Sequence, residues 1–239
     1  MRIDARNHGY TELNRVIRAS EDEKFQLENV LGQRYIGAGL SGKEIMIEGT
    51  PGNALGAYLN GSKIIVHGNA QDAIGDTMND GAIIVHGNCG DTTGYAMRSG
   101  EIYVKGNAGY RVGIHMKSYQ DLYPIIVIGG KVGDFLGEYQ AGGIIIVLGI
   151  GIEGCPVGSF CGTGMHGGEM FIRSETAPEG LPIQVCCTEA TDEEKQSIRH
   201  YIERFVKHFG SDADELLSGK FYKLTPNSAS PYKQLYVNN

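Results

Sequence analysis

The chain is poor in the residues and segments that mark several large classes of protein. Its 239 residues include no tryptophan, and only 8% are aromatic, which argues against a stacking platform for sugars or bases. The longest apolar run, Ile144 to Leu148, is far shorter than the roughly 20 residues that cross a bilayer. The first residues, MRIDARNHGYTEL, contain no apolar signal region. We therefore expect a cytoplasmic protein that does not associate with membranes.

Paired cysteines and clustered positive charge are also missing. The five cysteines are an odd number without a CxxC pair, which argues against a disulfide framework and a zinc ribbon. They are not clustered in the way that an iron–sulfur centre requires. The formal net charge is -7, and no patch of lysine and arginine stands out, so nucleic acid is not an expected partner.

Glycine, in contrast, is abundant and regularly spaced. It makes up 36 of the 239 residues, roughly twice the usual share. Glycines that follow an apolar run recur every 19 residues from Gly49 to Gly106, and the series then continues at Gly130 and Gly151. From each of these positions glycine recurs three and seven residues later, with Gln71 as the one exception. The glycines of this structural motif are Gly49, Gly52, Gly56, Gly68, Gly75, Gly87, Gly90, Gly94, Gly106, Gly109, Gly113, Gly130, Gly133, Gly137, Gly151, Gly154 and Gly158.

The apolar runs between the glycines predict one strand per repeat. EIMIEG, KIIVHG, AIIVHG and EIYVKG are short, β-branched and bounded by glycine, and no repeat has room for a helix of ten or more residues. We therefore predict a mainly β protein, a single-stranded right-handed parallel β-helix (a solenoid) with about 19–24 residues per coil. Ile45, Ile64 and Ile83 would stack as one ladder, and Met78 and Met97 would belong to a second ladder on the opposite wall.

The two flanks differ from the repeats. Thr11 to Ala19 is predicted as a short amphipathic helix. A capping box at Thr191 and helical spacing up to Gly210 predict a C-terminal α-helix that caps one end of the solenoid. The polar tail from Thr225 to Asn239 either drapes over the surface or docks on a partner. The chain is thus divided into 1–28 (helix and lead-in strand), 29–187 (glycine repeats) and 188–239 (C-terminal helix and tail).

The stretch from about Asn29 to Arg173 carries a resemblance to a known family. It includes "NVLGQRYIGAGLSG", "GTPGNALGAYLNG", "GNAQDAIGDTMNDG" and "GGKVGDFLGEYQAGGIIIVLG". Glycine triplets in this setting resemble the C-terminal GXGXG-motif domain of the glutamate synthase large subunit. Formylmethanofuran dehydrogenase and N-methylglutamate synthase each contain one similar chain.

The resemblance implies a scaffold rather than an enzyme. In glutamate synthase this domain is a right-handed β-helix without catalytic residues, packed between the amidotransferase domain and the FMN/iron–sulfur synthase domain. The chain lacks an amidotransferase cysteine at its start, since residue 2 is Arg2, and has no room for an FMN barrel. We expect a non-catalytic subunit of a glutamate synthase-type oxidoreductase in glutamate biosynthesis, without a cofactor or metal of its own.

Partners and alternatives follow from the same resemblance. The expected partners are glutamine amidotransferase and FMN/iron–sulfur synthase subunits, and a homo-oligomer stays open. One alternative is a scaffold for N-methylglutamate synthase or formylmethanofuran dehydrogenase. The other is an enzyme with its own metal or thiol site.

The glycine motif itself raises the question of phosphate binding. A phosphate-binding loop needs one glycine-rich turn that leads into a helix, often followed by GK[ST]. Here six such turns lead into strands and no GK[ST] follows. We therefore interpret the glycines as structural corners, where the chain turns or two backbones approach closely.

Histidines and aspartates near these corners are weaker candidates. His67 and His86 occupy equivalent positions, so we expect their rings about 4.8 Å apart on neighbouring strands. No third ligand joins their column, which favours a solvated pair over a metal site. Asp76, Asp91 and Asp134 lie near the corners, but the basic cleft of a polysaccharide lyase is not evident.

The last repeat holds the most unusual turn, residues 161–168, with extra glycines. Cys161, Met165 and His166 in this turn are candidates for contact with a partner. Cys155 lies six residues before Cys161, and residues 186–187 are a vicinal cysteine pair. Buried small thiols are commoner than redox centres, so no cysteine is assigned a catalytic role.

Overall fold

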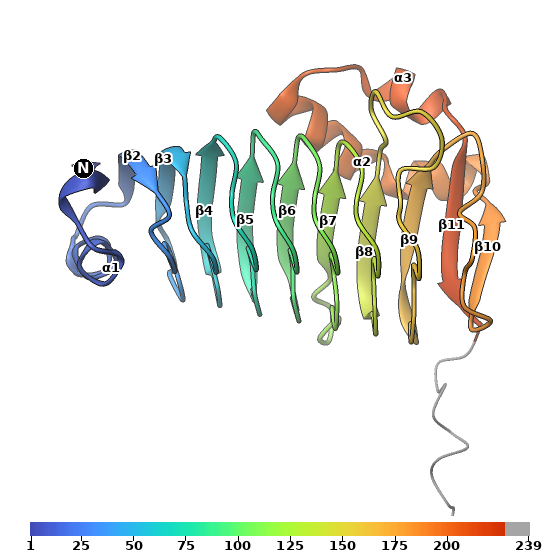
Figure 1. The fold of residues 1–239 in the computed structure, drawn as a ribbon, viewed down its shortest axis with the longest axis horizontal. Coiled ribbons are helices and arrows are strands. Elements are labelled where there is room, and N and C mark those ends of the chain that lie inside the picture. The colour runs from blue at the N-terminus through green and yellow to red at the C-terminus, as the bar shows by residue number, and fades with distance from the viewer. Residues whose placement is uncertain (228–239) are drawn as a thin grey trace, which may run out of the picture.

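The computed structural model describes residues 1–227, which form one eleven-stranded sheet with its strands side by side in a row (Figure 1). The strands follow the order of the chain from β1 to β9, and β11 and then β10 complete the sheet. The strands are β1 (Arg2–Asp4), β2 (Lys24–Leu31), β3 (Glu44–Thr50), β4 (Asn60–His67), β5 (Asp80–Val85), β6 (Gly100–Val104), β7 (Pro124–Ile128), β8 (Ala141–Val147), β9 (Gly167–Arg173), β10 (Val185–Glu189) and β11 (Phe221–Pro226).

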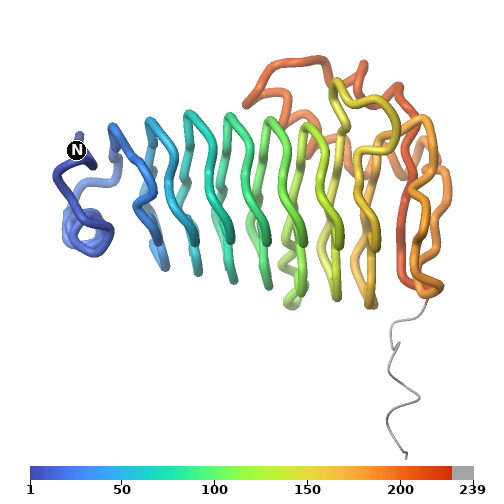
Figure 2. Tube along the Cα trace, viewed as in Figure 1, coloured from blue at the N-terminus to red at the C-terminus, as the bar shows by residue number. Residues whose placement is uncertain are grey.

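The glycine period sets the register of the parallel strands. Ile45 pairs with Ile64, and Ile64 pairs with Ile83, as the spacing of 19 residues predicts, so this stacking is confirmed. Figure 2 shows the same path repeated from strand to strand, with longer excursions before β7 and after β8. The first excursion accounts for the longer spacing before Gly130, and the second lengthens the step from β8 to β9, where Ile144 pairs with Glu169.

The predicted right-handed parallel β-helix with a C-terminal helical cap is wrong. The structure is a single, mostly parallel sheet with a few helices, an α/β arrangement. Within residues 1–227 the segments that return from one strand to the next form turns and isolated bridges, so no second wall of strands faces the sheet. The final strands also break the parallel pattern, because β11 is antiparallel to both β9 and β10.

Backbone conformation explains why the return segments are not strands. Most of them contain non-glycine residues with positive φ spaced four residues apart, such as Ala54 (φ 63°) and Tyr58 (φ 56°). Residues in this left-handed region interrupt an extended chain and turn it. Periodic glycines alone do not reveal this, since non-glycine residues rarely adopt such angles.

Both faces of the sheet are packed. On the inner face, the strands and the return segments enclose Ile45, Ile64, Val66, Met78 and their equivalents, and all four of these side chains are fully buried. A second hydrophobic core lies on the outer face of the sheet. It consists of Ile84, Tyr103, Ile125, Val127, Ile146, Leu148, Phe171, Ala190, Ile198, Ile202, Phe205, Leu216, Leu217 and Phe221.

Helices cover one end of the inner core and part of the outer face. α1 (Tyr10–Ala19), preceded by the short 3-10 helix η1 (Ala5–Asn7), buries Leu13 and Ile17 in the inner core at the end of the row near β2. α2 (Asp192–Phe209) and α3 (Ala213–Ser218) lie against the outer face (Figure 1). Thr191 and Glu194 form the predicted capping box of α2. The apolar stripe of α2 therefore packs on the sheet rather than over an end of it.

The sheet runs through all three parts into which the sequence was divided. β1 and β2 begin it before residue 29, and β11 contributes to it after residue 187. The three-part division stays a prediction. Of the tail from Thr225 onward, β11 takes the first two residues, and 228–239 lie outside the described residues. Among residues 1–227, no helix combines the length and the apolarity that a bilayer crossing requires.

Candidate functional site

An asparagine ladder explains the first glycine of the motif at Gly87, Gly106 and Gly130. The Oδ1 atom of Asn69 accepts a hydrogen bond from the backbone N–H of Asn88 at 2.8 Å, and Asn88 accepts one from Asn107 at 2.8 Å. A Cβ atom at Gly87 or Gly106 would collide with these oxygens. The glycines therefore leave room for a side chain that joins one repeat to the next.

An aspartate ladder explains the second glycine in the same way at Gly90, Gly109 and Gly158. The Oδ1 atom of Asp72 accepts from the N–H of Asp91 at 3.0 Å, and Asp91 accepts from Tyr110 at 2.8 Å. A Cβ atom at Gly90 or Gly109 would overlap with those carboxylates. Because each carboxylate holds a backbone N–H group, the chemistry of these aspartates is structural. Asp76 differs, since its side chain accepts from the hydroxyl of the adjacent Thr77.

The exception at Gln71 has a local reason. The preceding repeat carries Asn53 where later repeats carry Asp72 and Asp91, and the Asn53 side chain makes no hydrogen bond to described residues. No carboxylate therefore occupies the space beside Gln71. The third glycine of the motif has a different role, because Gly56, like its equivalents, has a positive φ (64°).

The last repeat lies out of register with the sequence motif. A Cβ atom at Gly151 or Gly154 would meet nothing within 4 Å, whereas one at Gly158 would collide with Asp134. Gly158 thus occupies the second glycine position, and Gly162, with φ of 75°, occupies the third. The excursion after β8 inserts residues ahead of this corner, which shifts the motif away from Gly151.

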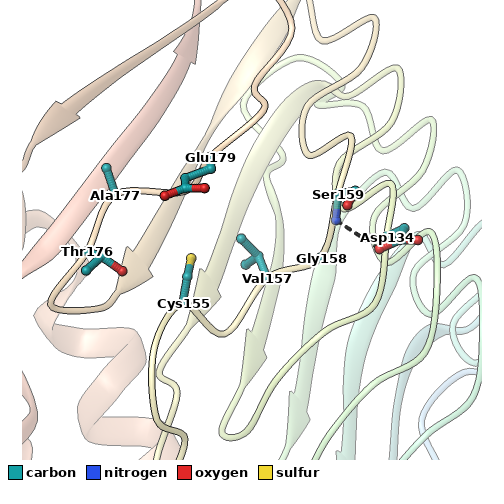
Figure 3. A pocket seen from close by; sticks show the side chains of 8 residues that line it. All are labelled: Asp134, Cys155, Val157, Gly158, Ser159, Thr176, Ala177 and Glu179. Carbon is teal, nitrogen blue, oxygen red and sulfur yellow. Dashed lines mark hydrogen bonds between the residues drawn. The ribbon is translucent and has the colours of Figure 1, made fainter.

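A shallow cleft lies at this last corner (Figure 3). It has a volume of about 370 Å³ and adjoins a second hollow of about 410 Å³. Its walls are the corner, with Cys155 and Val157, and the segment between β9 and β10, with Thr176 and Glu179. Asp134 stands at its edge, where Oδ1 accepts from the N–H of Ser159 at 2.9 Å.

Two thiols near the cleft, those of Cys161 and Cys187, are not activated as nucleophiles. Cys161 is buried, and burial raises the pKa of its thiol well above the ordinary range, with the nearby thiols of Cys155 and Cys187 adding to the effect. Burial also raises the pKa of Cys187. A reactive cysteine needs a lowered pKa and a neighbouring base or cation. The cleft lining contains no histidine, lysine or arginine, so these thiols fit packing better than catalysis.

The paired histidines stack as predicted, but only His67 is exposed to solvent, since His86 is half-buried. The ring centroids of His67 and His86 are 4.7 Å apart, and Phe209 of α2 packs edge-on against His86 at 5.0 Å. Burial lowers the pKa of His86, with smaller contributions from His67 and Lys105. Within residues 1–227, no group of three or more histidine, cysteine or acidic side chains is placed to hold a metal ion.

The predicted contact turn is mostly interior. Cys161 and Met165 are 1% and 0% exposed, and His166 is half-buried with Nδ1 3.0 Å from the carbonyl oxygen of Gly164. Of the three, only His166 reaches the surface. Phe160, immediately before this turn, is exposed, with 54% of its surface accessible.

Sequence reasoning missed a set of surface aromatics on the return segments. Phe135 stacks on Phe160 with ring centroids 5.0 Å apart, and His115 stacks on Tyr139 at 5.1 Å with an interplanar angle of 7°. Phe135 and Tyr139 lie five and nine residues after Gly130, and His115 lies nine residues after Gly106, which was the available signal. The glycine columns drew attention away from the residues between them.

Comparisons with known proteins give matches over most of the chain. A model of the GXGXG motif family matches residues 12–227. The uncharacterized protein MJ1350 of Methanocaldococcus jannaschii is 46% identical over 249 residues, which covers 98% of this chain and 95% of the relative.

A solved structure shares the fold. It is a chain in the crystal structure of the formyltransferase/hydrolase complex (FhcABCD) from Methylorubrum extorquens in complex with methylofuran. The TM-score is 0.67 with 23% identity, over 92% of this chain and 89% of that chain. At this identity the likeness concerns the arrangement of the backbone.

Proposed function

Because the chain belongs to the GXGXG family, we propose that it is a non-catalytic structural subunit of a multi-subunit enzyme complex. The observation that carries the proposal is the pair of ladders at the glycine corners. Their side chains, which are the repeated polar groups of the motif, hold backbone N–H groups of the next repeat. These hydrogen bonds stiffen the chain, and they occupy the side-chain oxygens of the motif.

The nature of the complex is a separate part of the proposal. The matching fold of a chain in a formyltransferase/hydrolase complex favours a scaffold in a complex of that kind, close to the formylmethanofuran dehydrogenase alternative. Glutamate synthase partners, an amidotransferase and an FMN/iron–sulfur synthase, rest on the sequence resemblance alone. N-methylglutamate synthase stays open on the same ground.

Purification from the native cell tests the subunit role. The tagged chain is expressed from its own locus, isolated under mild conditions and compared with an unrelated tagged protein from the same cells. We expect stoichiometric partner chains that are absent from the control. Recovery of the chain alone, in a preparation where the tag is accessible, would contradict the proposal.

The chemistry of the partners then separates the complexes. A glutamate synthase-type assembly would bring flavin and iron–sulfur absorbance together with glutamine hydrolysis. A formyl-transfer assembly would instead transfer formyl groups to a furan-type carrier and show no glutaminase activity. Enzyme activity in the isolated chain, with no partner added, would favour an enzyme with its own site.

A further inference from the structure

Aromatic side chains form two parallel rows on the turn edge, which is the edge of the molecule made by the return segments. The first row is Phe135 and Phe160, stacked at 5.0 Å, with the guanidinium of Arg111 4.6 Å from the centre of the Phe135 ring. The second row is Tyr95, His115 and Tyr139, with ring centroids 5.9 and 5.1 Å apart. We call these five rings, Phe135, Phe160, Tyr95, His115 and Tyr139, the aromatic patch.

The backbone under the patch is strained. Phe135, Phe160, His115 and Tyr139 all have positive φ, between 53° and 62°. Bulky residues in this region cost of order 1–3 kcal/mol each, and glycine or asparagine would adopt it more readily. Glycine stands at the equivalent position next to Tyr139, where a Cβ atom on Gly164 would collide with the tyrosine ring. Aromatic residues are thus present where the local backbone disfavours them.

The patch also has a basic rim. Arg98 follows Tyr95 by three residues, and Lys117 follows His115 by two. They lie on successive repeats, since the backbone N–H of Lys117 donates to the carbonyl of Met97 at 3.0 Å. Both side chains belong to exposed residues, and neither forms an ion pair with any residue in 1–227.

Carboxylates on this edge do not neutralise the rim. Glu138 is bound to Arg111 at 3.1 Å, and Asp134 holds the backbone N–H of Ser159. Asp76 and Asp80, on the repeat before Arg98, accept hydrogen bonds from the hydroxyl of Thr77 and the N–H of Gly81, and Asp121 lies in the turn between Tyr119 and Leu122. On a protein with a net charge of -7, Arg98 and Lys117 thus form no ion pair within residues 1–227 and lie close in sequence to the exposed Tyr95 and His115.

We propose that the aromatic patch and its rim, Arg98 and Lys117, dock an acidic segment of a partner polypeptide that also carries apolar or aromatic side chains. The rings supply rigid apolar contact area, as aromatic residues do at the centres of protein interfaces. The two cations pair with carboxylates and set the orientation of the segment. The inference rests on the proposed subunit role, because it names the surface that a partner subunit contacts.

The direct test measures binding of defined probes to the full chain. The probe is a random copolymer of glutamate and tyrosine, with polyglutamate and a lysine–tyrosine copolymer for comparison. We expect the glutamate–tyrosine copolymer to bind more tightly than polyglutamate, the lysine–tyrosine copolymer not to bind, and binding to weaken as salt rises. Equal binding of all three, or preference for the lysine copolymer, would overturn the proposal.

Matched variants separate the patch from the overall charge. Arg98→Glu with Lys117→Glu should weaken binding of the glutamate–tyrosine copolymer by about tenfold or more, because like charges then face it. Arg15→Glu with Lys24→Glu makes the same change in net charge at exposed residues of α1 and β2 and should bind as the unaltered chain does. Phe160→Ala, an exposed position, should weaken binding without unfolding the chain. Similar losses in the two double variants would contradict a docking site at the patch.

Other occupants of the patch would appear as distinct results. A dimer of the unaltered chain in sedimentation, abolished by Arg98→Glu with Lys117→Glu, would make a second copy the occupant and overturn the proposal. Tighter copolymer binding by a chain ending at Asn227 would make residues 228–239 the occupant, with the same consequence. If the rim variant still recovers all partners from native cells, the docking site is wrong while the subunit role stands. If neither chain recovers partners, the subunit role fails and the copolymer result decides the patch on its own.

Discussion

The outer face of the sheet and the turn edge both carry large side chains, yet only the outer face is covered by the chain itself. Tyr103 on β6 is 1% exposed because α2 packs over it, whereas Phe160 on the turn edge is 54% exposed. The outer face is therefore part of the folding core. The turn edge presents its aromatic residues to solvent and accepts backbone strain to do so. A difference of this kind separates a surface that stabilises the chain from one that is available to another molecule.

Removing one aromatic ring from each region should give the largest difference in stability between the two regions. Phe205 of α2 is 1% exposed, packs 4.8 Å from Phe209 and fills the space over Gly129. We expect Phe205→Ala to lower the free energy of unfolding by about 3–5 kcal/mol. Phe160→Ala should lower it by about 1 kcal/mol or less, since it loses one exposed stacking contact.

Urea denaturation followed by circular dichroism measures both variants. If Phe205→Ala does not fold, Phe205→Leu keeps the comparison, with a smaller loss expected. Equal losses at the two positions would show that the turn edge is as much a part of the core as the outer face.

The glycine corner is the rigid part of the turn edge and gives the next largest effect. Alanine at position 109 would displace the Asp91 carboxylate from the N–H of Tyr110, so we expect Gly109→Ala to cost about 3 kcal/mol. Gly133 is the matched control. The nearest atom to a Cβ there is Cδ1 of the Tyr110 ring at 3.0 Å, and no carboxylate is displaced. A smaller cost for Gly133→Ala, measured by thermal unfolding, would support the ladder, and an equal cost would contradict it.

Acid should loosen the outer face more than the turn edge. Burial is the main cause that lowers the pKa of His86 and of His208, and the latter lies 5.5 Å from the Tyr103 ring. The folded state thus binds fewer protons than the unfolded state, whose histidines titrate near pH 6.5. By linkage, stability is full above that pH and falls as the pH drops from about 6.5 through the lowered folded values.

The measurement compares urea midpoints at pH 8 and at pH 5.5. We expect His208→Gln to reduce the difference between the two midpoints, because it removes one of the groups that protonate on unfolding. His115→Gln, on the turn edge, is the control. An unchanged pH dependence in His208→Gln would mean that α2 docks independently of this histidine.

The sequence predicted much of the structure of the repeats but little of the structure around them. The spacing of glycine predicted the parallel register and the stacking of His67 on His86, and the pattern from Thr191 to Glu194 predicted the capping box of α2. These features depend on local chemistry repeated at a fixed interval. The β-helix assignment was wrong because the left-handed residues of the return segments, such as Tyr58, are not encoded by a recognisable residue type.

Long-range packing was the other gap. As a sequence pattern, the apolar stripe of α2 is equally consistent with a helix that caps one end of the sheet and with a helix that covers its outer face. Only the apolar outward residues Ile84, Tyr103 and Val127 decide between the two. The antiparallel return of β11 beside β9 depends on the whole C-terminal segment. At the candidate site, the second glycine position of the last repeat lies at Gly158 instead of Gly154, because an insertion preserves the glycine spacing by coincidence.

The smallest expected effect tests whether the aromatic residues of the turn edge stabilise the fold. Tyr58 is 57% exposed with φ of 56°, a conformation that asparagine adopts more readily than tyrosine. We expect Tyr58→Asn to leave stability unchanged or to raise it by up to about 1 kcal/mol. Tyr95→Asn is the control, because Tyr95 is also exposed but lacks a positive φ, so no strain is relieved. A clear loss of stability in Tyr58→Asn would mean that the edge aromatics hold the fold together, and the distinction between the two surfaces would fail.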